Sequence, residues 1–208
     1  MKQFWIFFLV LFTTFLGCKD NSDDNAVTNS DLTTYSIAQV STRLGEMYFW
    51  LYDETPMHKA KFIELSNQSH YNQFTFNRVV RNFVVQGGCP DSVQYFENSP
   101  YLLNPEFHDS IGHHYGALGM GRDDNPQMQS NACQFYIVCN EAGLPTLDNK
   151  YMIFGTIIQG EDVLEKIEME KTNSKDMPVT PIPLDVRILK KNADYLLDSL
   201  GFQIPNRL

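Results

Sequence analysis

The stretch FTFNRVVRNFVVQGG, residues 74–88, decides which fold this chain is expected to have. Phe, Val and Thr alternate through two short runs on either side of Arg-Asn, a pattern typical of a β-hairpin. Two residues do not suit an ordinary half-buried hairpin. Strict alternation places Arg78 on the strand face of Phe74 and Phe76, and Gln86 interrupts the apolar second strand just before a Gly pair. We therefore expect polar groups of this hairpin to belong to a site.

The segments around this hairpin predict a chain made mainly of short strands. A closed barrel removes the exposed strand edges, so we predict a mainly β protein: a closed eight-stranded antiparallel β-barrel capped by two α-helices. Residues 92–115 are interrupted by prolines and glycine and are expected to form a long surface excursion. The expected strands lie within 35–52, 74–88, 116–121, 133–140, 151–158 and 181–191, and the expected helices at 55–65 and 161–169.

The composition favours one globular domain and excludes one class of partner. The chain has 208 residues, of which 43% are hydrophobic, enough for a single well-packed core. Its formal net charge of -9 repels phosphate backbones. Nucleic acid is therefore not an expected partner, and we expect a monomer.

The N-terminus indicates export and lipid anchoring. Lys2 is followed by the apolar run FWIFFLVLFTTFLGC, which is short for a membrane span and typical of a secretory signal. Its end, Phe-Leu-Gly-Cys, resembles a bacterial lipobox, which would make Cys18 the acylated residue that anchors the chain to the bilayer. An ordinary signal peptide that happens to end near a cysteine is the alternative.

These features divide the chain into four parts. Residues 1–17 are expected to be the lipoprotein signal peptide, and residues 18–33 the lipidated cysteine with a polar tether. The globular domain is expected at 34–191. Residues 192–208 form a C-terminal tail whose leucine spacing indicates a helix. The predicted location is the cell envelope, with the domain anchored by lipid and expected at the outer membrane, on its periplasmic or surface side.

Several ordered motifs resemble those of one enzyme family. FNRVVRNFVVQGGCP, LGMGR and CQFYIVCNEAGLPTLDNKYMIFGTIIQGEDVLEKI follow one another along the globular part. Together they resemble the cyclophilin family of peptidyl-prolyl cis-trans isomerases, in a bacterial form similar to lipoproteins of Bacteroidota. The resemblance implies a proline-binding groove on the outer face of the barrel, proline-containing polypeptides as partners, and assistance to the folding of exported proteins.

The same resemblance assigns residues to the groove. Arg78 matches the catalytic arginine of the family, and Gln86 matches its catalytic amide. Thr146 stands where eukaryotic members carry a tryptophan that binds cyclosporin, so strong cyclosporin binding is not expected. The substrate-binding positions of the family fall on Phe83, Val84, Gly121, Gln134, Tyr136, Leu147 and Tyr151.

Elementary chemistry agrees with this assignment. Rotation about an X-Pro bond is opposed by roughly 18–20 kcal/mol because the amide loses resonance as it twists. No bond is broken, so the reaction requires no cofactor, metal or nucleophile. An apolar pocket that holds the ring and a donor such as Arg78 that meets the twisted amide are enough. Two rival hypotheses are a scaffold or holdase that binds proline segments with little turnover, and a lipocalin-like barrel with an internal ligand.

Two further groups of residues invite hypotheses. Cys89 and Cys133 carry inward parity and flank Gln86 and Gln134, so a disulfide between them is possible in an oxidising envelope; two small buried thiols are the alternative. A loop holds three histidines, which we expect to be solvated and not to bind metal. They are His108, His113 and His114.

Overall fold

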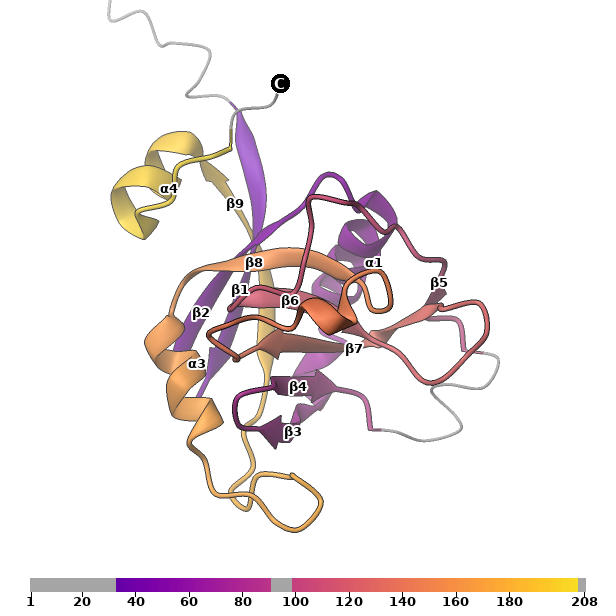
Figure 1. Cartoon of the computed structure of the whole chain (residues 1–208). Helices are drawn as coiled ribbons and strands as arrows, with labels where there is room; N and C mark the ends of the chain where they lie inside the picture. Colours follow the sequence, from indigo (N-terminus) through magenta and orange to yellow (C-terminus); the bar gives the residue numbers. More distant parts are fainter. Residues whose placement is uncertain (1–32, 91–98, 206–208) are drawn as a thin grey trace, which may run out of the picture.

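The computed structural model describes residues 33–90 and 99–205, and a curled antiparallel sheet dominates this part (Figure 1). The strands lie side by side in the order β3-β4-β7-β6-β8-β2-β1-β9, with the short strand β5 also paired to β7. The strands are β1 (Thr34–Thr42), β2 (Gly45–Leu51), β3 (Thr75–Val80), β4 (Val84–Gly88), β5 (Leu102–Leu103), β6 (Ala117–Gly121), β7 (Ser130–Val138), β8 (Ile153–Gln159) and β9 (Asp185–Asn192).

Three α-helices accompany the sheet in the described part of the chain. Helix α1 (Pro56–Asn67) packs on β9 and β7, and α3 (Glu161–Glu168) packs on β2 and β4. Figure 1 shows these two helices at opposite ends of the curled sheet. Helix α4 (Ala193–Leu200) follows β9, and two short 3-10 turns, η2 (Tyr71–Gln73) and η3 (Pro145–Leu147), lie in the connections.

The sheet is open, so the prediction of a closed eight-stranded barrel is wrong. The edge strands β3 and β9 are not joined by a ladder; one isolated bridge connects Thr75 to Pro183. Two separate hydrogen bonds flank this bridge. The Phe76 amide donates to the Ile182 carbonyl at 2.9 Å, and the Leu184 amide donates to the Phe74 carbonyl at 3.1 Å. Prolines at 181 and 183 have no N–H to donate, which prevents a continuous ladder along this seam.

A β-bulge in β3 corrects the expected placement of Arg78. The pairing of β3 with β4 shifts register between Phe76 and Arg78. An extra residue in one strand reverses the alternation beyond it. Phe76 and Val79 therefore both point into the core, whereas Arg78 points to the outer face. Phe76 and Arg78 therefore lie on opposite faces of β3, although their spacing in the sequence predicted a shared face.

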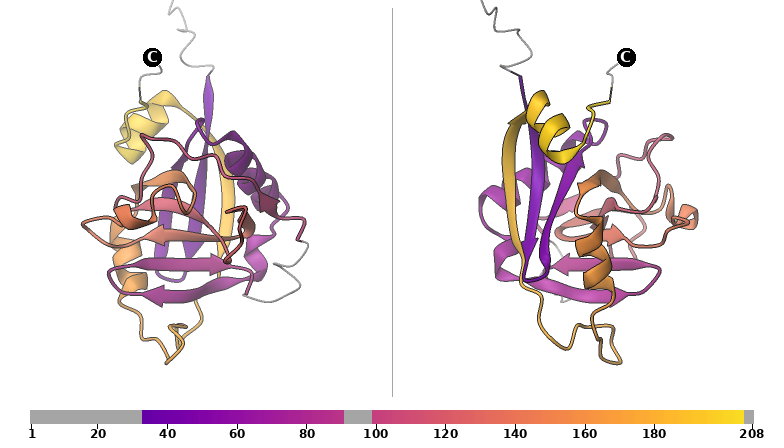
Figure 2. Two further views of the ribbon diagram at one scale, coloured as in Figure 1. Left: turned by 45° about the vertical axis from the view of Figure 1, so that its right-hand side comes forward. Right: turned by 90° about the vertical axis from the view of Figure 1, so that its left-hand side faces the viewer.

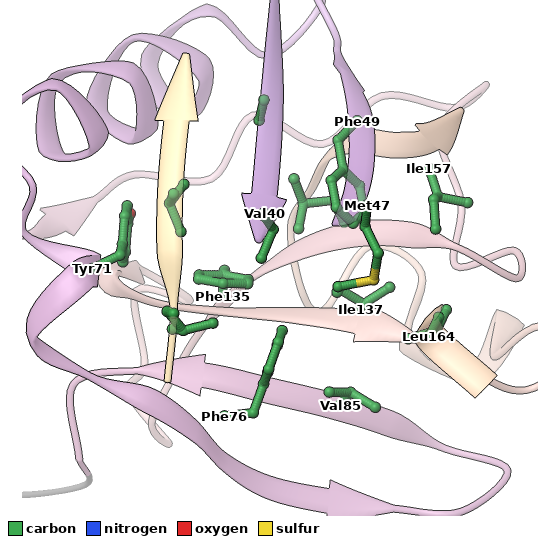
Figure 3. Packing of buried hydrophobic residues seen from close by; sticks show 14 of the residues in the cluster. Val40, Met47, Phe49, Tyr71, Phe76, Val85, Phe135, Ile137, Ile157 and Leu164 are labelled. Carbon is green, nitrogen blue, oxygen red and sulfur yellow. The ribbon is translucent and has the colours of Figure 1, made fainter. Parts of the chain in front are cut away.

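The core lies on the concave side of the sheet and is rich in aromatic side chains (Figure 3). Phe135 and Ile137 of β7 point into it, as their parity predicted, and are fully buried. The buried Tyr71 hydroxyl donates to the Ala132 carbonyl at 2.6 Å, so its polar atom is satisfied. Each buried side chain of this size contributes about 1.5–3 kcal/mol. The core therefore fixes β7, and with it the residues that β7 presents on the opposite face.

Helix α4 covers an outer part of the sheet. The Asn192 side chain accepts from the Tyr195 amide at 3.0 Å and caps the helix start, and Gly201, at φ 64°, ends it. Leu196 and Leu200 pack against Trp50. Figure 2 shows α4 beside β1 and β9, close to where the described chain begins. Within residues 33–90 and 99–205, none of the helices is both long and apolar enough to cross a membrane.

Candidate active site

The outer face of β3, β4, β7 and β6 carries most of the predicted site residues. The strand registers pair Arg78 with Gln86, Gln86 with Tyr136, and Tyr136 with Gly119. Four neighbouring strands thus contribute one residue each to a single row across the sheet. This row brings the predicted arginine, amide and aromatic ring together on one surface.

An apolar group of side chains, here named the outer apolar cluster, lies along this row. It contains four predicted binding residues: Phe83, Val84, Tyr136 and Tyr151. Leu147, also predicted, is half-buried in η3, and its carbonyl accepts from the Tyr151 amide at 3.1 Å. The other members of the cluster are Tyr52, Ile111, Ala117, Val138, Leu144 and Ile153.

The two glutamines form a hydrogen-bonded pair beside the cluster. The Gln86 Nε2 donates to Gln134 Oε1 at 3.0 Å, and the Gln134 Nε2 donates to the Cys89 carbonyl at 2.6 Å. Gly121 packs against them: a Cβ there would lie 2.6 Å from the Gln134 Cβ. A side chain at Gly121 would therefore displace Gln134. The chain of bonds holds the Gln86 amide in one orientation, with its Oε1 available to a substrate N–H.

Arg78 is only loosely held. Its guanidinium carbon lies 5.7 Å from the centre of the Phe83 ring, and its Nε is 3.9 Å from a carboxylate oxygen of Asp176. Both side chains are well exposed, at 39% and 51%, so this ion pair contributes little to stability. The guanidinium is therefore free to donate to a group placed over Phe83.

His113 is a site residue that the sequence interpretation assigned to solvent, and that expectation is wrong. It is 3% exposed, its ring stacks on Tyr136 at an interplanar angle of 9°, and its Nε2 lies 2.8 Å from the Tyr136 hydroxyl. Its Nδ1 lies 2.7 Å from Asp148 Oδ1, which also accepts from the His113 amide at 2.9 Å. No local pattern indicates this role, because the partners lie 23 and 35 residues away in the sequence.

Burial shifts the pKa values of His113 and Tyr136. Desolvation lowers the pKa of His113, although the neighbouring Asp148 acts in the opposite direction. Burial also raises the pKa of Tyr136 well above its usual value, so the phenol stays protonated. The neutral imidazole then donates a hydrogen bond from Nδ1 to Asp148 and accepts one at Nε2 from the Tyr136 hydroxyl. This arrangement fixes the ring of Tyr136 within the outer apolar cluster.

Two of the three cysteines in the described part of the chain form a disulfide next to the site. Cys89 and Cys133 form a disulfide, and Cys139 is a buried free thiol. The disulfide joins the end of β4 to β7, one residue from Gln134. Across residues 33–90 and 99–205, no three His, Cys, Asp or Glu side chains converge in a way that would hold a metal ion. Cys18 and the predicted signal peptide lie outside the described residues.

Comparison with known proteins agrees with this geometry. Residues 37–188 match the family model of the cyclophilin type peptidyl-prolyl cis-trans isomerase. A peptidyl-prolyl cis-trans isomerase of Schizosaccharomyces pombe is 32% identical over 149 residues, covering 70% of this chain and 94% of the relative. One of Arabidopsis thaliana is 32% identical over 141 residues, covering 67% of this chain and 82% of the relative.

A solved structure shows the same fold. It is a cyclophilin type isomerase of Cryptosporidium parvum, studied in the presence of the dipeptide Ala-Pro, with a TM-score of 0.66 and 24% identity. The match covers 74% of this chain and 98% of that one. The chain belongs to the cyclophilin-type peptidyl-prolyl cis-trans isomerase family. It is accordingly an isomerase of X-Pro peptide bonds.

Proposed function

We propose that this chain isomerises X-Pro bonds of exported polypeptides at the outer face of β3, β4, β7 and β6, while acylated Cys18 anchors it in the cell envelope. The observation that supports the site is the single row of Arg78, Gln86 and Tyr136 across three adjacent strands. The proline ring of a client packs into the outer apolar cluster, over Tyr136. Gln86 holds the client backbone, and Arg78 donates to the twisting amide.

The rate enhancement arises from differential binding. A planar X-Pro amide delocalises the nitrogen lone pair, and a twisted amide restores that lone pair as a hydrogen-bond acceptor. A guanidinium that donates to the twisted nitrogen, or to the adjacent carbonyl, therefore binds the transition state more tightly than the ground state. Removing one such preorganised donor in other enzymes costs about 100–1,000-fold in rate. Arg78 needs no ionised partner to act in this way.

The test compares two arginines of one hairpin. Arg78→Ala is expected to lower kcat/KM for a proline peptide by about 100-fold or more, measured by NMR exchange between cis and trans forms. Arg81→Ala is the matched control, because Arg81 is exposed and its guanidinium donates to the Met169 carbonyl at 3.4 Å, away from the outer apolar cluster. Urea unfolding of both variants checks that the fold is intact.

The outcome separates the isomerase from its rival. If Arg78→Ala exchanges the peptide as fast as the unmodified protein does, Arg78 is not catalytic. If the unmodified protein binds the peptide without accelerating exchange, the chain is a scaffold or holdase for proline segments. Binding is followed separately by titration of chemical shifts, so the two readouts do not depend on each other.

Anchoring and drug binding are tested apart from catalysis. We propose that replacing Cys18 by Ser moves the protein from the membrane fraction to the soluble fraction, and that protease treatment of intact cells reveals which side the domain faces. The domain is proposed to act as a monomer. Thr146 is exposed within η3, at the position that resembles that of the eukaryotic tryptophan, so strong cyclosporin inhibition is not expected.

A further inference from the structure

A second guanidinium flanks the proposed proline pocket from the other side. Arg122 follows Gly121 directly at the end of β6, and β6 pairs with β7 on the side opposite to β4. Its guanidinium carbon lies 4.5 Å from the centre of the Tyr151 ring, a member of the outer apolar cluster. Arg78 and Arg122 therefore stand on opposite sides of Tyr136.

Arg122 lacks the partners that other arginines of the described chain have. Arg43 pairs with Glu170 and Arg187 with Asp185, each at 2.6 Å. The Nε and Nη1 of Arg122 are buried without any hydrogen-bond acceptor, and no carboxylate among the described residues lies within 4.0 Å of its guanidinium. A buried donor without an acceptor is costly, and the protein covers these two nitrogens. Nη2 is not one of the buried atoms, so it is the donor that a ligand can reach. This positive charge therefore remains unneutralised in a protein whose net charge is -9.

The surroundings of Arg122 hold its charge close to the pocket. The cation–π contact with Tyr151 holds the guanidinium against the outer apolar cluster. A guanidinium makes strong, charge-assisted hydrogen bonds to carboxylates, and at Arg122 the Nη2 group is the one placed to make them. A residue of extended chain spans about 3.3–3.6 Å, so a group that contacts Arg122 belongs to a residue next to the proline or one further along.

We propose that Arg122 forms a carboxylate subsite beside the proline pocket and selects client segments that carry Asp or Glu within two residues of the proline. This inference rests on the proposed function, because it requires the client to lie across the outer apolar cluster. It adds the chemical class of the preferred clients. Arg122 acts on client affinity and specificity, whereas Arg78 acts on the twisting bond.

The experiment uses peptides that differ at one position. Glu, Gln or Lys is placed in turn at each of the two positions before and after one proline, in peptides with acetylated and amidated ends. Blocked ends remove the terminal carboxylate, and one peptide with a free C-terminus tests that source separately. The measured quantity is the ratio of kcat/KM for the Glu peptide to that for the Gln peptide within each variant, so changes in overall rate cancel.

At the best position we expect the unmodified protein to prefer Glu over Gln by about tenfold, mainly through KM, with the preference falling at high salt. Arg122→Gln removes the preference, Arg122→Glu shifts it toward the Lys peptide, and the control Arg81→Gln retains it. Equal kcat/KM for Glu and Gln at all four positions, or a preference that persists in Arg122→Gln, overturns the proposal. A preference only for the free C-terminus overturns the side-chain assignment.

The same experiment distinguishes a wrong carboxylate subsite from a wrong assignment of isomerase activity. If the unmodified protein does not accelerate exchange of the Gln peptide, the proposed function fails. The subsite is then judged by calorimetric affinities for the same Glu and Gln peptides, which must differ in the unmodified protein and not in Arg122→Gln. If exchange is accelerated but the ratio is one, isomerisation stands and the subsite is rejected.

Discussion

Breaking the Cys89–Cys133 disulfide is expected to remove a large share of the stability of the domain. The bridge closes a loop of 44 residues. In the chain-entropy model, a bridge of that span removes about 2.1 + 1.5R ln 44 from the entropy of the unfolded chain, or about 13 cal/mol/K. At 25 °C this corresponds to about 4 kcal/mol. Domains of this size are stable by about 5–15 kcal/mol in total, so the loss is substantial.

The assay is urea unfolding followed by circular dichroism, with and without a thiol reductant. Cys89→Ala with Cys133→Ala is expected to lower the free energy of unfolding by about 4 kcal/mol and Tm by about 8–16 °C, whatever the redox state. The unmodified protein should lose a similar amount only when reduced. Because the Cys89 carbonyl accepts from Gln134 Nε2, we also expect kcat/KM to fall on reduction.

Cys139 supplies the matched control. Burial raises the pKa of this free thiol to about 12, so it is neutral and unreactive at ordinary pH. Cys139→Ala is expected to cost on the order of 1 kcal/mol, equally in the presence and absence of reductant. The reasoning would be refuted if the double variant and the oxidised unmodified protein unfolded at the same urea concentration.

Two further predictions concern protons and the C-terminal helix. Burial lowers the pKa of His58, His70 and His113, so the unfolded chain binds protons that the folded one does not, and the free energy of unfolding should fall as pH drops below about 6.5. Urea unfolding between pH 7 and 5 should show this decline, with a smaller slope in His70→Gln; a flat profile would contradict it. In helix α4, Leu196→Ala should lower the free energy of unfolding by about 2–5 kcal/mol, because Leu196 is fully buried against the sheet. Leu197→Ala, at the exposed neighbouring position, should lower it by about 0.5 kcal/mol or less in the same urea unfolding experiment. Equal losses would mean that α4 does not dock on the sheet.

The sequence predicted those parts of the site that follow from alternation along a strand. Val84 and Gln86 share the outer face of β4, while Val85 between them enters the core. Tyr136 likewise faces outward, between the inward Phe135 and Ile137. A strand of period two leaves no other arrangement once one face is buried. The apolar wall and the amide of the site were therefore accessible to sequence reasoning.

The remainder depended on contacts between distant segments. The role of His113 requires Tyr136 and Asp148, and nothing near His113 in the sequence specifies either partner. A histidine in a loop is usually solvated, and here two distant hydrogen bonds and a stacked ring reverse that expectation. Likewise, no motif indicates that the Nε and Nη1 of Arg122 lack a hydrogen-bond acceptor among the described residues, because this depends on how distant segments fold around them.

Two predictions that the structure corrects, the face of Arg78 and the closure of the barrel, both concern strand β3, and together they explain how Arg78 becomes available. A bulge after Phe76 turns Arg78 outward. The prolines at 181 and 183, opposite β3, prevent a continuous ladder of backbone hydrogen bonds between β3 and the segment that leads into β9. In a closed barrel another strand would flank Arg78 on that side. In the open sheet its neighbour is instead the loop that carries Asp176, whose carbonyl accepts from the Val79 amide at 2.8 Å and whose carboxylate stays 3.9 Å from the guanidinium. The irregular edge therefore supports β3 without pairing Arg78 tightly, which leaves the donor free to meet a twisting amide.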